Sequence, residues 1–367
     1  MSERSHRRDF LTGRSVREEL VRAGERLAES QQSPKTPPAA GDTVRLETRA
    51  MACNWNVILD PGPAEQVMAA SEALSIVHAL EAQLTVFREE SEVNALNRSL
   101  LFGDPFPVEQ GLFELLRQCQ QLHAETDGAF DPCVRPLLSL WRSCRQFGRL
   151  PTDLEVAHAL SWVGMQHLRL HEAEYAVSAR LHGLETPPLE IGIDLGAIGK
   201  GYAVDRAVQR LEQLDLPGFL LHGGYSTVFA RGGHGRHAGW PVGIKNPLFT
   251  NRRLGTLVLC DQALSSSGSN VQFYRHAGKR YGHLLDPRTG WPAETMLSVS
   301  VIAPTAAQAD ALSTAFYVMG LDNSLRYCDD HPDIGALWIP FPHKGRQLSP
   351  IVRNISEDVL FFEESQV

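Results

Sequence analysis

Four stretches of the sequence repeat apolar residues at the spacing of one helix face. Apolar side chains recur at i, i+3, i+4 and i+7, which places them on one side of a helix with 3.6 residues per turn. The second stretch is followed by Asp127-Gly128, a strong helix stop. We therefore expect helices over residues 66–84, 110–125, 199–214 and 306–319.

Shorter apolar runs, each bounded by Gly, Pro, Asp or Ser, are typical of strands. They predict strands over residues 56–59, 189–193, 218–221, 256–259 and 298–302. Strands and helices are interspersed but lack the regular spacing of βαβ units, which favours an α+β fold with a largely antiparallel or mixed sheet and packed helices. No shift in composition divides residues 46–342, so we expect one catalytic unit there, built of two lobes.

The two ends of the chain differ from this body. Residues 1–45 hold seven arginines within the first 26 positions, a short amphipathic helix pattern and then a Pro-rich linker. Arg7-Arg8 resembles a twin-arginine export motif, but charged residues follow where such a signal needs an apolar segment. We expect a cytoplasmic protein, with export as the alternative. Residues 343–367 form a polar C-terminal tail that we expect to dock through the apolar cluster at 359–362.

Composition narrows the class of partner. The 367 residues include 35 Lys and Arg against 43 Asp and Glu, for a formal net charge of −8. This acidic balance argues against nucleic acid or an anionic membrane as the partner, since both need clustered cations. The sequence contains no run of about 18 apolar residues, so it predicts no transmembrane helix. The six cysteines are scattered without a CxxC pair, which indicates free thiols in a reducing compartment.

A Gly-rich stretch at residues 193–205 is the first candidate for chemistry. We expect a strand that ends at Asp194, a tight turn, and a helix that opens near Lys200. Backbone amides at a helix N-terminus favour anions, and Lys200 adds a positive charge. The glycine spacing fits neither a Walker A loop nor a dinucleotide-binding turn. A strand-to-helix turn whose glycines serve packing is the alternative.

Two further segments carry polar pairs. His283 and Asp286 lie three residues apart in a loop, where a histidine suits general-base work near neutral pH. Asp310 and Thr314 share one helix face, and a carboxylate plus a hydroxyl is an oxygen-only pair suited to Mg²⁺. A hydrogen-bonded structural histidine and an aspartate stabilised by the helix dipole are the alternatives.

Two small-residue segments complete the set. The turn at 126–132 contains Gly128 and Phe130, which together suit contact with a planar ligand. Residues 264–268 follow a predicted strand and are small enough to allow close backbone approach. A plain loop is the alternative for both.

Taken together and in this order, the five segments resemble the ApbE family of FAD:protein FMN transferases over about residues 48–325. The specific matches are Asp194-Leu-Gly-Ala-Ile-Gly-Lys-Gly-Tyr-Ala-Val-Asp, His283-Leu-Leu-Asp-Pro-Arg-Thr-Gly and Ala309-Asp-Ala-Leu-Ser-Thr. The resemblance implies a protein that binds FAD in a cleft, cleaves its pyrophosphate with Mg²⁺ and transfers FMN to a Thr or Ser hydroxyl of a partner flavoprotein, releasing AMP.

The resemblance also implies roles for individual residues. Asp310, Thr314 and the backbone carbonyl of Ala197 would hold the metal. His283 would take the proton from the acceptor hydroxyl, and Lys200 would neutralise charge on the leaving group. The residues expected to line the FAD site are Met51, Phe87, Ala129, Phe130, Asp131, Asp194, Lys200, Leu285 and Asp286.

Three departures from the family pattern leave other functions open. An aromatic residue, Tyr225, replaces an acid after Gly-Gly; Met51-Ala52-Cys53 replaces Met-Gly-Thr; and Ser266-Ser-Gly268 lacks the usual residues after it. An Mg²⁺-dependent FAD pyrophosphatase, which releases FMN and AMP to water, is one alternative. An FAD-binding or assembly protein without turnover is the other.

Overall fold

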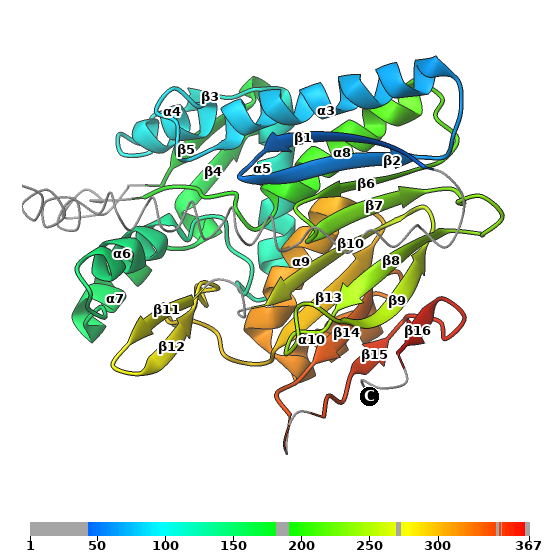
Figure 1. Ribbon diagram of the computed structural model, residues 1–367. Coiled ribbons are helices and arrows are strands. Elements are labelled where there is room, and N and C mark those ends of the chain that lie inside the picture. Colours follow the sequence, from blue (N-terminus) through cyan, green and yellow to red (C-terminus); the bar gives the residue numbers. More distant parts are fainter. Residues whose placement is uncertain (1–42, 181–190, 269–272, 343–344, 346, 364–367) are drawn as a thin grey trace, which may run out of the picture. The chain divides into compact units, whose positions relative to one another are not determined.

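The computed structural model describes residues 43–180, 191–268, 273–342, 345 and 347–363 (Figure 1). The predictions for residues 1–42 lie outside these ranges. The helices are α3 (Ala64–Leu84), α4 (Glu92–Ser99), α5 (Gln110–Glu125), α6 (Arg135–Gln146), α7 (Asp153–Leu160), α8 (Gly199–Gln213), α9 (Ala306–Met319) and α10 (Leu321–Asp330). The strands of the main sheet are β1 (Val44–Ala50), β2 (Cys53–Leu59), β6 (Phe219–Gly223), β7 (Thr227–Arg231), β10 (Gln262–Gly268), β13 (Ser298–Ala303), β14 (Gly335–Ile339) and β15 (Ile351–Arg353).

The main sheet has eight strands in the order β1-β2-β6-β7-β10-β13-β14-β15, and each neighbouring pair is antiparallel. Helices α3, α8 and α9 cover one face, as Figure 1 shows. Side chains alternate between the two faces of a strand, so Trp55, Phe219 and Val299 point into a core shared with these helices. The predicted α+β class with a largely antiparallel sheet is confirmed.

A second, three-stranded sheet packs against the other face of the main sheet. Its strands run in the order β16 (Leu360–Phe362), β9 (Arg253–Leu259) and β8 (Trp240–Lys245). Leu257 and Leu259 of β9 meet Leu264 and Ile302 of the main sheet in a separate apolar cluster. The C-terminal segment thus contributes one strand, β15, to the main sheet and another, β16, to this smaller one.

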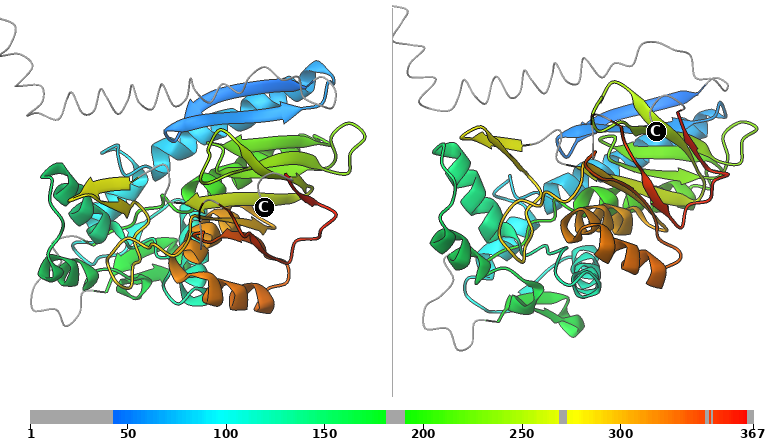
Figure 2. Two further views of the ribbon diagram at one scale, coloured as in Figure 1. Left: turned by 60° about the horizontal axis from the view of Figure 1, so that its bottom comes forward. Right: turned by 90° about the horizontal axis from the view of Figure 1, so that it is seen from below.

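The remaining elements form two small groups. One group is a three-stranded sheet in the order β3 (Phe106–Pro107), β5 (Ala176–Ala179) and β4 (Leu168–His171). Most of its buried apolar side chains belong to the main core, as do those of α4 and α5. Helices α6 and α7 instead pack on each other around Leu137 and Trp141. Next to them lies the hairpin of β11 (Phe273–His276) and β12 (Lys279–Gly282), which is separate from the main sheet in both views of Figure 2.

All four predicted helices are confirmed as α3, α5, α8 and α9. Four of the five predicted strands lie within β2, β6, β9 and β13, except that one prediction begins a residue too early, at Gly218. The fifth is wrong where the structure describes it, because Ile191–Ile193 belongs to no strand. The side chain of Asn97 occupies the place of a partner strand there. It accepts a hydrogen bond from Ile193 N at 2.6 Å and donates one to Ile193 O at 2.9 Å.

The plain loop expected as the alternative for residues 264–268 is wrong. These residues do follow the predicted strand, which is β9, but they form a strand themselves, β10, in the interior of the main sheet between β7 and β13. The hydroxyls of Ser265 and Ser267 hydrogen-bond to side chains of α9, which explains why such small polar residues occupy a central strand.

All six cysteines are free, as predicted. Among the described residues, no helix is long and apolar enough to cross a membrane.

Candidate active site

The N-terminal ends of α8 and α9 lie against each other, and each helix supplies a carboxylate to the backbone N–H groups at the start of the other. Asp205 of α8 accepts hydrogen bonds from Ala306 N at 2.6 Å and Ala307 N at 2.8 Å, at the start of α9. In return, Asp310 of α9 accepts one from Gly201 N at 3.0 Å, in the first turn of α8. Each carboxylate satisfies backbone N–H groups that a helix N-terminus leaves without partners. The two helix starts therefore have a fixed relative position.

Gly201 makes this close approach possible. A Cβ at this position would lie 2.1 Å from the carbonyl oxygen of Ala306, which is too close for any side chain. Gly199, two residues earlier, has no such constraint, since a Cβ there would meet only Leu195 at 3.8 Å. The second glycine of the Gly-Lys-Gly segment is thus required for packing between helices.

Asp310 lies in a polar cluster beneath the main sheet. Its side chain is only 6% exposed, and its Oδ1 accepts hydrogen bonds from Ser265 Oγ at 3.0 Å and Thr227 Oγ1 at 3.2 Å. Its Oδ2 lies 3.5 Å from Nζ of Lys200, whose side chain is 27% exposed. The carboxylate is therefore oriented from three sides while its cationic neighbour keeps access to solvent.

Hydroxyl groups surround the same helix face. Thr314 Oγ1 lies 3.4 Å from Ser267 Oγ, which also hydrogen-bonds to Ser313 Oγ at 2.8 Å.

Ala197 lies in the turn just before α8 and is partly buried. No three His, Cys, Asp or Glu side chains gather as a metal site anywhere in the described part of the chain. Any cation at α9 would depend on one carboxylate with hydroxyl and carbonyl oxygens, a donor set that fits Mg²⁺ and not softer metals.

The β1–β2 turn lies beside this cluster. Met51 and Ala52 form the two-residue turn, with φ of 49° and 59°, and Met51 N donates to Glu81 Oε1 at 2.8 Å. Cys53 follows, and burial raises the pKa of its thiol while the charge of nearby Lys200 partly opposes the rise. The altered Met51-Ala52-Cys53 opening thus lies close to the Lys200–Asp310 pair, and Ala52 occupies a backbone conformation that favours glycine.

The turn at 126–132 is rigid and holds a buried carboxylate. Asp131 Oδ1 accepts from Cys133 N at 2.8 Å, and Oδ2 lies 3.3 Å from Nδ1 of His123. Burial raises the pKa of the Asp131 carboxyl to about 6, although His123 and the Cys133 amide act in the opposite direction. Both Ala129 and Phe130 are buried in the main core. Their side chains are therefore unavailable as a flat surface, and only the backbone of this turn is left to meet a ligand.

Asp194 joins this turn to the Gly-rich segment. Its backbone N donates to Pro132 O at 2.8 Å, and its Oδ1 accepts from Gly196 N at 2.8 Å. The chain then continues through Ala197 to Lys200. The expected strand ending at Asp194 is absent, but the expected helix opening near Lys200 is present.

The loop at 283–290 carries the third group of predicted residues. Asp286 binds its own loop: its carboxylate pairs with the Arg288 guanidinium at 2.9 Å, and its carbonyl accepts from Gly290 N at 2.8 Å. Leu285 is buried with Leu137 and Trp141, away from the Asp310 cluster. His283 is exposed at the start of the loop, as expected of a residue that meets another molecule.

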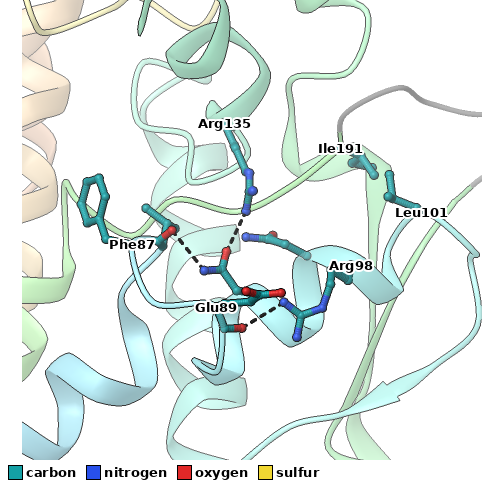
Figure 3. Close-up of a pocket in the computed structure, with 9 residues that line it drawn as sticks. Phe87, Glu89, Arg98, Leu101, Arg135 and Ile191 are labelled. Carbon is teal, nitrogen blue, oxygen red and sulfur yellow. Dashed lines mark hydrogen bonds between the residues drawn. The ribbon is translucent and has the colours of Figure 1, made fainter. Parts of the chain in front are cut away.

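A cavity of about 520 Å³ opens between α4, the loop before it and the start of α6 (Figure 3). Phe87 lies at one end, with 81% of its surface exposed, and Ile191 and Leu101 lie at the other. Arg135 donates to Asn94 at 3.1 Å, and Arg98 donates to Glu89 O at 3.0 Å. The lining is thus partly apolar and partly cationic.

The structure therefore sorts the predicted residues into separate groups. Lys200, Asp310 and Thr314 are together at the α8–α9 junction, and Met51 is near them. Asp131 and Asp194 are joined through Pro132. Phe87 belongs to the cavity, while His283, Leu285 and Asp286 lie on the loop after β12.

Several residues of these groups were not predicted from the sequence. Thr227 and Ser265 fix Asp310, Asp205 fixes the start of α9, and Arg98 and Arg135 line the cavity. Two of them had a sequence signal, since Asp205 closes the Gly-rich motif and Ser265 lies in the small-residue segment 264–268.

Tyr225, which departs from the family pattern, contacts residues outside the Asp310 cluster. Its ring stacks on His222 with centroids 5.1 Å apart, and Lys245 Nζ lies 5.2 Å from the ring centre. Because Leu221 points into the helical core, the alternation of β6 directs His222 to the opposite face of the sheet. Tyr225 is not among the partners of Asp310 described above.

Comparisons with known proteins show the family of the chain. The FAD:protein FMN transferase of Haemophilus influenzae is 28% identical over 298 residues, which span 78% of this chain and 83% of the relative. The enzyme of the same name from Treponema pallidum is 31% identical over 292 residues, which span 77% and 80%. The crystal structure of the ApbE protein of Thermotoga maritima superposes with a TM-score of 0.73 at 26% identity, over 86% of this chain and 98% of that one. The family model described as the ApbE family matches residues 51–338, and the chain belongs to that family.

Proposed function

We propose that the protein transfers FMN from FAD to a Thr or Ser hydroxyl of an acceptor flavoprotein, in an Mg²⁺-dependent reaction that releases AMP. The observation that carries this proposal is the α8–α9 junction, which brings Lys200, Asp310 and Thr314 together in a chain of the ApbE family. Similar proteins named FAD:protein FMN transferase support the same chemistry.

The reaction exchanges the phosphoanhydride bond of FAD for a phosphoester bond to the acceptor. The acceptor oxygen attacks the phosphorus of the FMN half, the bond from that phosphorus to the bridging oxygen breaks, and AMP departs with the bridging oxygen. The hydroxyl proton passes to a base. Such a transfer depends mostly on positioning and on neutralising charge.

At the α8–α9 junction, Asp310, Thr314 and the carbonyl of Ala197 would hold Mg²⁺. When bound, Mg²⁺ would neutralise charge on the pyrophosphate oxygens. Lys200 supplies the chain's own positive charge at the same place, and the amides at the start of α8 favour an anion. Because Asp310 is buried and already oriented by Ser265 and Thr227, little reorganisation accompanies binding.

The flavin side of FAD would be held by the other groups. Phe87 offers an exposed aromatic ring at the cavity, and Met51 lies at the β1–β2 turn near Lys200. The backbone of Ala129, Phe130 and Asp131, with Asp194 and Asp286, would complete the walls, and Leu285 would fix the last loop. His283, exposed at the start of that loop, is the proposed base for the acceptor hydroxyl.

The test is an incubation of the purified full chain with FAD, Mg²⁺ and a flavoprotein acceptor domain from an organism that has one of the similar transferases. Mass spectrometry of the acceptor and chromatography of the free nucleotides separate the possible results. An acceptor heavier by FMN, with an equal amount of AMP, supports the proposal. FMN and AMP without modified acceptor would indicate a pyrophosphatase, and bound, unchanged FAD would indicate a binding or assembly protein.

A further inference from the structure

The β11–β12 hairpin carries a concentrated positive charge in an acidic chain. Its residues 273–282 include Arg275, Lys279 and Arg280 and contain no Asp or Glu, whereas the whole chain has a net charge of −8. The strand register places Arg275 directly opposite Arg280. Like charges directly opposite each other destabilise a hairpin, so this arrangement costs stability that an anionic partner would restore.

One face of the hairpin is attached to the rest of the protein. Tyr281 packs near Trp141 of α6, with ring centroids 6.0 Å apart, and near Tyr274 at 6.5 Å. Lys279 on the same face lies 3.9 Å from Glu294. Because side chains alternate along a strand, Phe273, Arg275 and Arg280 share the opposite face.

That opposite face combines an aromatic ring with two guanidinium groups. The Arg280 guanidinium carbon lies 3.9 Å from the centre of the Phe273 ring, and that of Arg275 lies 5.4 Å away. Both arginines are exposed, and Phe273 is half-buried. Stacked arginines on a ring present a broad cationic surface suited to carboxylates.

One end of this face lies next to the loop that carries the proposed base, because Phe273 pairs with Gly282, the residue before His283. β12 ends at Gly282, and His283 is the next residue. A segment seated on Phe273, Arg275 and Arg280 would therefore lie directly beside the loop at which the acceptor hydroxyl must arrive. Figures 1 and 2 show the hairpin beside α6, at a distance from the main sheet.

We propose that the face formed by Phe273, Arg275 and Arg280 docks an acidic segment of the acceptor flavoprotein, next to the Thr or Ser that is modified. This proposal rests on the proposed function, because it assigns an acceptor to the same site. Electrostatic docking of this kind acts on the encounter and on specificity more than on the chemical step.

Binding to designed peptides tests the surface directly. Fluorescence anisotropy would measure the affinity of the full chain for a labelled threonine peptide flanked by glutamates, and for matched peptides with glutamines or lysines. We expect the glutamate peptide to bind about tenfold more tightly than the glutamine peptide, with a preference that declines as NaCl rises. Equal affinity for the three peptides, or no binding of the glutamate peptide, would overturn the proposal.

Variants assign the effect to the hairpin. The double variant Arg275→Glu, Arg280→Glu should bind the glutamate peptide about tenfold more weakly or worse. Arg275→Lys, Arg280→Lys should bind more weakly than the wild type but more tightly than the glutamate variant, because it keeps the charge and loses the stacked guanidinium groups. Arg252→Glu is the matched control, since that exposed arginine also lies 5.4 Å from a phenylalanine ring, Phe249, at another site. An equal loss in the control, or none in the double variant, contradicts the proposal. Arg275→Gln, Arg280→Gln controls for unfolding of the hairpin, because it removes both charges without reversing them, and it should show an intermediate loss.

Two activity measurements separate this proposal from the proposed function. In the glutamate double variant, we expect the rise in KM to fall on the acceptor domain, with FAD cleavage in the absence of acceptor unchanged. A rise in KM for FAD instead would mean that the arginines serve FAD. If the wild type transfers no FMN but its peptide binding still depends on both arginines, the surface stands and the proposed function fails.

Discussion

The α8–α9 junction and the loop after β12 are held in place by different kinds of contact. At the junction, the carboxylates of Asp205 and Asp310 join two helices through backbone amides, and Asp310 also accepts from two strands. The loop is fixed at its far end, where Trp141 Nε1 donates to Gly290 O at 2.8 Å, while His283 at its near end is exposed.

This difference indicates a division of labour within the candidate site. A buried, fully bonded carboxylate suits a task in which geometry must not change, such as holding a cation and a pyrophosphate. An exposed histidine next to a charged hairpin suits a task in which a second protein must approach. Under the proposed function, the junction would serve the part of the reaction that is the same for every acceptor, and the loop would serve the part that varies.

The largest effect is expected from Asp310→Ala, which should abolish Mg²⁺-dependent turnover. The change removes the proposed metal ligand and leaves Gly201 N without its acceptor, at a cost of about 1–3 kcal/mol, whereas the hydroxyls of Thr227 and Ser265 keep the hydrogen bond between them at 3.1 Å. FMN transfer at several Mg²⁺ concentrations is the measurement. Asp310→Asn is the control for folding, because it keeps the shape and loses the charge. Mg²⁺-dependent transfer at the wild-type rate in either variant would exclude Asp310 as ligand.

His283→Asn should lower the rate of FMN transfer by about 10²–10⁴-fold, the usual contribution of a positioned general base. FAD binding and the midpoint of thermal unfolding should not change, because the side chain is exposed. Rates with a saturating acceptor domain measure the effect. His276→Asn in the neighbouring hairpin is the control, and the role fails if the two variants transfer FMN equally fast.

Some of this arrangement could be predicted from the sequence because it depends on periodicity. The apolar spacing of α3, α5, α8 and α9 needs no knowledge of the fold, and Asp310 and Thr314 share a helix face wherever that helix packs. The same reasoning could not show that Asp310 meets Lys200. That contact depends on Gly201 lying against Ala306, more than a hundred residues away in the sequence.

The two wrong predictions have the same cause, because long-range polar contacts override local propensity. The apolar run at Ile191 and Ile193 is typical of a strand, but the Asn97 amide takes the hydrogen bonds that a neighbouring strand would make. Small polar residues such as Ser265 favour a loop, but hydrogen bonds to α9 stabilise them within a central strand.

Gly201→Ala should have a smaller effect than either substitution above and tests whether the junction must be tight. A methyl group 2.1 Å from a carbonyl oxygen must push α8 away from α9, which should lower the free energy of unfolding by about 1–3 kcal/mol and weaken Mg²⁺ activation. Gly199→Ala is a control within the same helix turn, because a Cβ there makes only an ordinary contact. Urea unfolding and Mg²⁺ titration of both variants measure the difference, and equal behaviour would show that α8 can move without consequence.

Asp205→Asn should have the smallest effect and should show itself as a change in pH dependence. An asparagine can accept only one of the two hydrogen bonds from the start of α9, so the free energy of unfolding should drop by about 1 kcal/mol. Burial raises the pKa of the Asp205 carboxyl to about 6, above its usual 3.8. The folded state therefore keeps the proton that the unfolded state loses, and the contribution of Asp205 to stability declines as pH rises from about 4 to about 6.

The variant should lack this slope, which unfolding experiments across that pH range would detect. Asp261→Asn is the matched control. Asp261 also accepts from a backbone amide, that of Gly232 at 3.0 Å, but this bond and the nearby Arg231 lower the pKa of its carboxyl. Its contribution is therefore lost as pH falls below the usual range of an aspartate, the opposite sign from Asp205. If Asp205→Asn leaves the slope between pH 4 and 6 unchanged, the carboxylate that joins α8 to α9 is not the group that titrates there.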